Sequence, residues 1–221
     1  MNYFLDTNVP TGYTVPHDKW HESSVNFIEN TSCPLYWSNL VKEEYNELLE
    51  SIVDDVEIFL DESKKVLKEN QKDFHNYERF ERFILRKTKH CKLENYKKVK
   101  ILEEFWINNN FIEGISEEVH IKFSGFMQNI NKLYYKRDSK LNKFMTLHDC
   151  GLDNYLKYEN YARGLYNAGV HKPDCKIIVD AHDCGLAHDD LIFITNDVEM
   201  INAISKINTS HLMIVEFRSC N

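Results

Sequence analysis

The sequence predicts an α/β fold: a mostly parallel central sheet flanked by helices, with a long helical insertion. Short apolar runs occur near both ends of the chain, and segments with helical periodicity separate them. Strands that alternate with helices favour a mostly parallel sheet with helices on both faces. Between the two ends, residues 46–165 show helical periodicity almost throughout. We expect them to form an insertion or subdomain within a single domain of residues 1–221.

The first third of the chain is predicted to supply two strands. Residues 2–5 form a buried apolar run, and a loop containing proline and glycine over residues 10–16 leads to a helix over residues 18–30. Residues 35–37 form a second short strand. Ser38 stands where a side chain caps the next helix.

The middle of the chain is predicted to be helical. The first helix begins at Leu40 and either continues or breaks near Asp61. Aromatic side chains at three-residue spacing between residues 74 and 83 indicate a helix face packed in a core. The helices expected after residue 61 cover residues 73–85, 96–106, 116–135 and 154–166.

The last third returns to alternating elements. A helix over residues 174–184 is expected to stop at Gly185 in the left-handed conformation. The elements expected after it are a strand over 191–195, a helix over 198–204 and a strand over 212–217.

Composition narrows the classes of function. Hydrophobic residues make up 43% of the chain, which is enough for a core. The six cysteines include no CxxC pair and no zinc-ligand spacing, so the sequence predicts no zinc site. No signal peptide and no apolar run near 18 residues is present, so we expect a cytoplasmic protein without a membrane span.

Four acidic residues stand at the edges of predicted elements: Asp6, Glu44, Asp174 and Asp197. Asp6 and Asp197 directly follow apolar runs, and the carboxyl ends of parallel strands meet at one edge of a sheet. Clustered carboxylates suit Mg²⁺ or Mn²⁺, and such an ion suits phosphodiester hydrolysis. Without a cation these carboxylates would repel one another. The sequence therefore predicts a metal-dependent hydrolase site, with Asp6 and Asp174 as direct ligands and Glu44 and Asp197 binding directly or through water.

At these residues the chain resembles the PIN-domain nucleases. Residues 4–9 resemble that family's first strand and first acid, and residues 38–44 its second motif, a strand-end serine with a glutamate six positions later. Residues 174–181 resemble the third motif and residues 194–197 the fourth. The resemblance covers roughly residues 1–45 and 170–221. It implies a nuclease, most simply a ribonuclease, with the four acids as catalytic and metal-binding residues.

Other residues are expected to assist these acids. Asn8 and Thr195 are predicted to orient the carboxylates or the attacking water, whereas Thr7 is expected only to cap the turn after the strand. Glu43 adjoins Glu44, but successive helix residues point about 100° apart, so only one of the two is expected to face the site. Asp180 is left open as an outer acid.

The resemblance implies RNA as a partner, with DNA not excluded, and the charge pattern offers a surface that could hold a nucleic acid. The net charge is −8, but bases gather between residues 82 and 100 and again between 132 and 143, interleaved with tyrosines. Bases can hold phosphates, and aromatic rings can stack on bases of a nucleic acid. A solvated helix face is the alternative interpretation. The residues proposed to bind substrate are Lys97, Lys98, Lys100, Lys136 and Arg137.

Two alternative functions stay open. The first is an RNA-binding PIN-like module that does not cleave. The second is an HD-type phosphohydrolase, because His148-Asp149-Cys150-Gly151-Leu152 recurs as His182-Asp183-Cys184-Gly185-Leu186. His182 and His188 are instead expected to be surface or capping residues. A homodimer or a regulatory protein partner is also left open.

Overall fold

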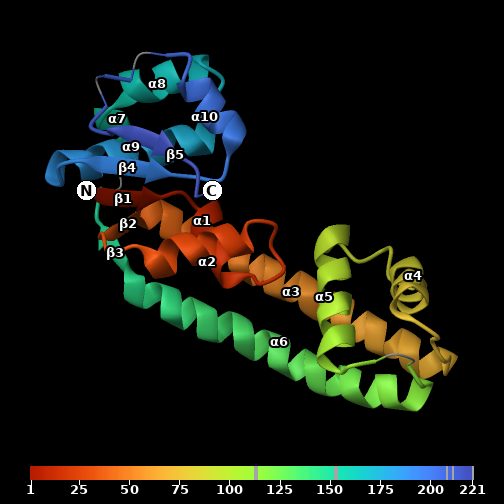
Figure 1. Ribbon diagram of the computed structural model, residues 1–221. Helices are drawn as coiled ribbons and strands as arrows, with labels where there is room; N and C mark the ends of the chain where they lie inside the picture. Colours follow the sequence, from red (N-terminus) through yellow and green to blue (C-terminus); the bar gives the residue numbers. More distant parts are fainter. Residues whose placement is uncertain (112–113, 152–153, 208, 211, 221) are drawn as a thin grey trace. The chain divides into compact units, whose positions relative to one another are not determined.

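The computed structural model describes residues 1–111, 114–151, 154–207, 209–210 and 212–220. The chain forms two compact units, which are coloured by sequence in Figure 1. One unit, here called the sheet unit, consists of Met1–Leu48 and Arg137–Asn221. The other, the helical unit, consists of Leu49–Lys136.

The sheet unit is built on a parallel sheet, as predicted. In the described part of the chain the sheet has five strands in the order β3-β2-β1-β4-β5, and every neighbouring pair is parallel. The central strands are almost wholly buried, which explains why they appear in the sequence as unbroken apolar runs. The strands are β1 (Asn2–Leu5), β2 (Leu35–Ser38), β3 (Met145–His148), β4 (Leu191–Ile194) and β5 (Glu216–Arg218).

Helices cover both faces of this sheet. The ring of Tyr3 in β1 meets the ring of Phe27 in α2 edge-on, 5.2 Å between centroids. The next residue, Phe4, faces the other way because side chains alternate along a strand. Phe4 is in register with Tyr36, whose ring stacks on His188 at the end of α9. The helices are α1 (Asn8–Thr14), α2 (His21–Asn30), α7 (Asn154–Lys157), α8 (Glu159–Asn167), α9 (Lys172–Ala187) and α10 (Val198–Ile204).

Two predictions for the sheet unit are wrong. Residues 8–14 form the helix α1, although a loop was expected there. Pro10 lies in the first turn, where its missing N–H leaves no helical hydrogen bond unmade. Gly185 lies inside α9 and is not a left-handed stop. A Cβ at Gly185 would lie 1.9 Å from the carbonyl oxygen of Met213, so only glycine lets that segment approach the helix.

The predicted insertion of residues 46–165 is too long. Residues 145–148 form β3 and pair with β2, so the chain after residue 136 belongs with the sheet. This strand was missed because it is half-exposed and follows a helix without an intervening turn. The last strand is also displaced: it covers Glu216–Arg218, where the sequence predicted residues 212–217.

The helical unit is formed by parts of α3 (Asn39–Asn70) and α6 (Ser116–Phe144) with α4 (Tyr77–Lys87) and α5 (Asn95–Asn108). The first of these, α3, continues without a break past Asp61. The aromatic stripe is part of a core, as predicted: the rings of Phe80 and Trp106 lie 5.2 Å apart. Within the described residues of both units, no helix is both long enough and apolar enough to cross a membrane.

Candidate functional site

The predicted acids follow strands that lie side by side. Asp6 comes directly after β1, and Thr195, Asn196 and Asp197 follow β4, its parallel neighbour. From β1 the chain builds the sheet outward through β2 and β3, then returns to the other side of β1 for β4 and β5. The edge between β1 and β4 is therefore a topological switch point, where open α/β sheets bind ligands.

Asp6 is the most buried of the four acids, with 4% of its surface exposed. Its Oδ1 accepts a hydrogen bond from the backbone N–H of Thr7 (2.8 Å), and its Oδ2 accepts one from the hydroxyl of Thr195 (2.7 Å). The pKa of Asp6 is raised to about 7, first because burial disfavours the charged form. The charges of Asp174 and Glu44 add to this shift, and the hydrogen bonds from Thr195 and Thr7 oppose it.

Asn8 and Thr195 hold Asp6, as the sequence predicted. The Asn8 amide donates to Asp6 Oδ2 and to Thr195 Oγ1, while its Oδ1 accepts from the backbone N–H of Asn196 at 2.8 Å. Thr195 Oγ1 also accepts from the backbone N–H of Asp197. This hydroxyl thus makes one donated and two accepted hydrogen bonds, which is all that a hydroxyl can make. The loops after β1 and β4 are tied together by these side chains.

Thr7 has a role that the sequence analysis missed. Its backbone N–H donates to Asp6, and its hydroxyl donates to Glu44 Oε2 at 2.7 Å. Thr7 therefore connects the first acid to the second. Its side chain makes no capping hydrogen bond to α1, so the expectation that Thr7 only caps the turn is wrong. Glu44 is half-buried in α3, and its charge raises the pKa of Asp6. Glu43 is exposed and lines one pocket together with Glu44, so that only one of the two faces the site stays a prediction. The sequence feature that could have indicated this role was the position of Thr7 between Asp6 and Asn8.

The other two acids begin helices. Asp174 is half-buried in the first turn of α9, and its pKa is raised by burial and by the charges of Asp197 and Glu44, with His171 opposing. Asp197 is the N-cap of α10, where its Oδ1 accepts from the backbone N–H of Met200 at 2.9 Å. The four carboxylates are therefore electrostatic neighbours.

The acids do not form a closed ligand cage. Among the described residues, no three of them have carboxylate oxygens that all lie within 4.8 Å of one another. Oxygens bound directly to one Mg²⁺ at about 2.1 Å would lie no more than about 4.2 Å apart. In this arrangement at most two of the acids can contact one ion directly. The others would act through water, a form of binding that Mg²⁺ commonly adopts.

Two lysines of α9 that were not predicted to bind substrate line pockets of the sheet unit. Lys172 and Lys176 line a pocket of about 330 Å³ beside Glu44. The same two lysines line a second pocket of about 500 Å³ with Tyr155, Tyr166 and Arg163. The Lys176 ammonium lies 4.8 Å from the centre of the Tyr155 ring. The signal in the sequence was the placement of both lysines within two residues of Asp174.

The lysines predicted to bind substrate are partly in the wrong environment. Lys98 is 2% exposed, and its ammonium donates to the carbonyls of Cys91 (2.8 Å) and Thr88 (3.4 Å). It lies on the same face of α5 as Ile101 and Leu102, so its stem packs inward. Lys97 is also buried and pairs with Glu94 at 2.9 Å. The prediction that these two lysines face a substrate is therefore wrong.

The remaining predicted bases differ in their surroundings. Lys100 and Lys136 are exposed in the helical unit. Arg137 belongs to the sheet unit, where its guanidinium donates to the carbonyl of Tyr13 at 3.4 Å.

The repeated His-Asp motif does not form an HD site. His148 ends a strand of a parallel sheet, whereas that family places its His-Asp pair on helices in an all-helical fold. Leu152, the last residue of the first copy, lies outside the described residues. His182 is 4% exposed and accepts from the backbone N–H of Met213, so the expectation of a surface or capping residue is wrong. His188 follows α9 in the capping position, as expected.

Asp180, which was left open as an outer acid, lies elsewhere in the sheet unit. It is buried and accepts from the amide of Asn154 at 3.1 Å, and hydrogen bonds with Ser38 and Cys150 also engage it.

Comparisons of this chain with protein-family models, with curated proteins and with solved structures find no match.

Proposed function

We propose that this protein is a nuclease of PIN-like fold that depends on Mg²⁺ or Mn²⁺ and hydrolyses phosphodiester bonds in RNA. One observation carries the proposal: the buried Asp6 is held by Thr7, Asn8 and Thr195 at the switch point of a parallel sheet, close enough to Glu44 and Asp174 to interact with their charges. Burying an acid beside other acids is costly unless a cation offsets their repulsion.

The donor set fits a hard divalent ion. The four acids offer carboxylate oxygens, the ligands that Mg²⁺ and Mn²⁺ prefer. Asp6 and Asp174 are assigned as direct ligands. A bound ion would polarise the phosphate and lower the pKa of a water molecule.

Each assisting residue then has a task that follows from its contacts. Thr195 and Asn8 keep the Asp6 carboxylate in one orientation. Thr7 holds one oxygen of Glu44, which leaves the other oxygen to orient water. Lys172 and Lys176 would hold phosphates in the pocket that they line with Glu44, and Tyr155 and Tyr166 offer rings on which bases can stack.

The test is cleavage of a labelled single-stranded RNA by purified protein with Mn²⁺, with Mg²⁺ and with chelator. We expect cleavage only with metal, and a loss of at least about 100-fold in Asp174→Asn because a direct ligand is removed. Asp189→Asn, at an exposed aspartate outside the site, serves as the matched control and should cleave like the parent. Equal cleavage by Asp174→Asn and the parent would contradict the proposal.

The same surface also supports the second candidate, an RNA-binding module without activity. The observation in its favour is that no three acids are close enough for direct binding to one ion. RNA binding without metal-dependent cleavage of RNA or DNA would decide for this alternative.

A further inference from the structure

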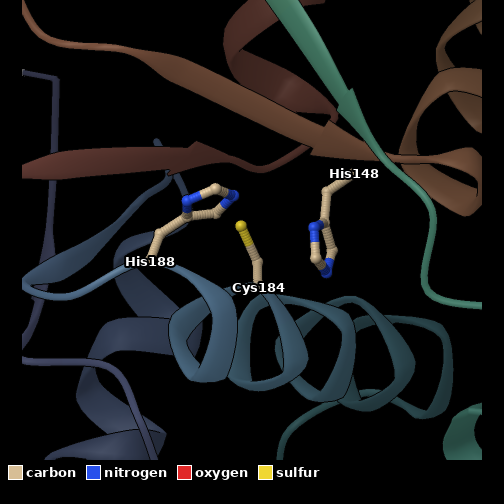
Figure 2. Close-up of side chains that lie close together, drawn as sticks. All are labelled: His148, Cys184 and His188. Atoms are coloured by element: carbon tan, nitrogen blue, oxygen red, sulfur yellow. The ribbon is translucent and has the colours of Figure 1, made fainter.

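A second group of ligand-type side chains lies in the sheet unit, apart from the four acids. His148 ends β3, Cys184 lies in the last turn of α9 and His188 follows that helix. Figure 2 shows the two imidazoles on either side of the Cys184 sulfur, between the strands and α9. One atom from each residue lies within 4.8 Å of the other two. Two segments of the chain, the end of β3 and the end of α9, therefore direct an N, S, N donor set toward one point.

Neighbouring side chains hold both histidines in place. His148 Nε2 lies 3.3 Å from Asp183 Oδ2, and Asp183 also accepts from the Tyr158 hydroxyl at 3.0 Å. This contact uses Nε2 and leaves Nδ1 of His148 to face Cys184. The His188 ring stacks on Tyr36 with 4.4 Å between centroids and 24° between planes. Metal-binding histidines usually have such a carboxylate partner for the second ring nitrogen.

The cysteine is enclosed by this arrangement. Cys184 is 0% exposed, and two imidazoles lie beside its sulfur. A buried cysteine alone is commonly an apolar packing residue. Two oriented histidines next to the thiol are not explained by packing alone. His148 also belongs to a second group with Cys150 and Asp183, so ligand-type side chains surround it on two sides.

We propose that His148, Cys184 and His188 bind one Zn²⁺ ion, with Asp183 positioning His148. Two imidazoles and one thiolate suit a borderline-soft ion, whereas the four acids suit a hard one. In a tetrahedral zinc site the ligand atoms stand roughly 3.3–3.8 Å apart, so closing this group from within 4.8 Å takes shifts of about 1 Å. The fourth coordination position is left to water.

The ion would stabilise the edge of the sheet that β3 forms. The strand β3 is short and half-exposed, and among the described residues it pairs on one side only, with β2. Binding at His148, Cys184 and His188 connects the end of this strand to the end of α9. The site is separate from the acids, because Asp174 and Cys184 lie ten residues apart on α9, about 15 Å at 1.5 Å per residue. The ion would therefore act apart from the acidic site.

No zinc site was expected from the sequence, because the cysteines form no CxxC pair and show no zinc-ligand spacing. The ligands here come from two distant segments, and the only local signal is the spacing Cys184-x-x-x-His188 across the end of a helix. Residues four apart lie on one helix face, which brings these two side chains together.

The experiment uses the full chain, stripped of metal under reducing conditions and titrated with Co²⁺ as a spectroscopic substitute for Zn²⁺. We expect one equivalent of Co²⁺ to give a thiolate-to-cobalt charge-transfer band that Zn²⁺ abolishes by displacement. Cys184→Ser should remove the band and weaken affinity by at least about 100-fold. Cys175→Ser, another buried cysteine on α9 outside both groups, is the matched control and should keep it.

Two further variants separate this site from folding and from the acids. His188→Gln should weaken the band in a protein whose circular dichroism is unchanged, so the test does not depend on Cys184→Ser alone. Asp6→Asn with Asp174→Asn should leave the band intact, whatever the outcome of the cleavage assay. Zn²⁺ at about 100 times its Kd should raise Tm by about 5–10 °C in the parent and not in Cys184→Ser. Absence of a thiolate band in the parent, or its persistence in Cys184→Ser, would overturn the proposal.

Discussion

The hydroxyl of Thr195, at the end of β4, donates a 2.7 Å hydrogen bond to the carboxylate of Asp6, at the end of β1. The two residues are 189 positions apart in the chain and meet because their strands are parallel neighbours. The same hydroxyl accepts from Asn8 and from the backbone of Asp197. The Thr195 hydroxyl thus takes part in three of the hydrogen bonds that set the geometry of the acidic site.

Replacing Thr195 by a residue without a hydroxyl should destabilise the protein. Thr195→Val removes the donor to Asp6 and leaves part-buried N–H groups of Asn8 and Asp197 without the hydroxyl as their acceptor. We expect the free energy of unfolding to fall by about 1–3 kcal/mol, measured by urea denaturation. Thr146→Val, at an exposed position of β3, is the matched control and should change it little. Equal stability of Thr195→Val and the parent would show that these hydrogen bonds contribute nothing.

The raised pKa of Asp6 predicts how stability of the metal-free protein depends on pH. The carboxyl titrates near 3.8 when unfolded and at about 7 when folded. Between these values the folded state holds a proton that the unfolded state has lost, so stability falls as pH rises from about 4 to 7. The contribution is at most about 1.4 kcal/mol per pH unit for one group, and it levels off above pH 7.

Denaturation of parent and Asp6→Asn between pH 4 and 8 measures this term. Asp6→Asn also loses hydrogen bonds, so the readout is the slope with pH and not the stability at one pH. We expect the variant to lose the downward slope. Saturating Mn²⁺ should flatten the slope in the parent, because a cation favours the ionised form. A variant with the same slope as the parent would mean that Asp6 ionises normally.

Lys172 and Lys176, which line a pocket with Glu44, should carry the electrostatic part of RNA binding. Lys172→Gln with Lys176→Gln should weaken binding of single-stranded RNA and reduce the salt slope by about 1.4, since each neutralised phosphate contributes about 0.7. Fluorescence anisotropy in chelator measures affinity without cleavage. The matched control is Lys100→Gln with Lys136→Gln, two exposed lysines of the helical unit. A larger loss of RNA affinity in the control pair would show that RNA binds to the helical unit, as first predicted from the sequence.

Lys98 should matter for stability instead of binding. Its ammonium reaches the backbone carbonyls of Thr88 and Cys91 just after α4, where the negative end of the helix dipole favours a cation. Lys98→Met keeps most of the stem and removes both hydrogen bonds. We expect a loss of about 1–3 kcal/mol in the free energy of unfolding, with RNA affinity unchanged. The reverse result, weaker binding at unchanged stability, would contradict the buried position.

The elements that the sequence predicted well are those whose environment is uniform along the segment. The strands β1 and β4 are covered on both faces, so they appear as continuous apolar runs. By contrast, β3 lies at an edge and α1 contains a proline and a glycine, so neither shows the pattern of its class. Local composition in these two segments conflicts with the structure that packing against neighbours imposes.

For the candidate site, the sequence by itself determined which side chains stand at the carboxyl edge of the sheet. Asp6, Asn8, Thr195 and Asp197 follow buried strands, and strand direction alone brings them to one edge. The tertiary structure decided which bases accompany them, with Lys98 buried and with Lys172 and Lys176 lining a pocket with Glu44. It also brought His148 to Cys184 and His188. Such contacts depend on how distant segments pack, and no periodicity along one segment encodes them.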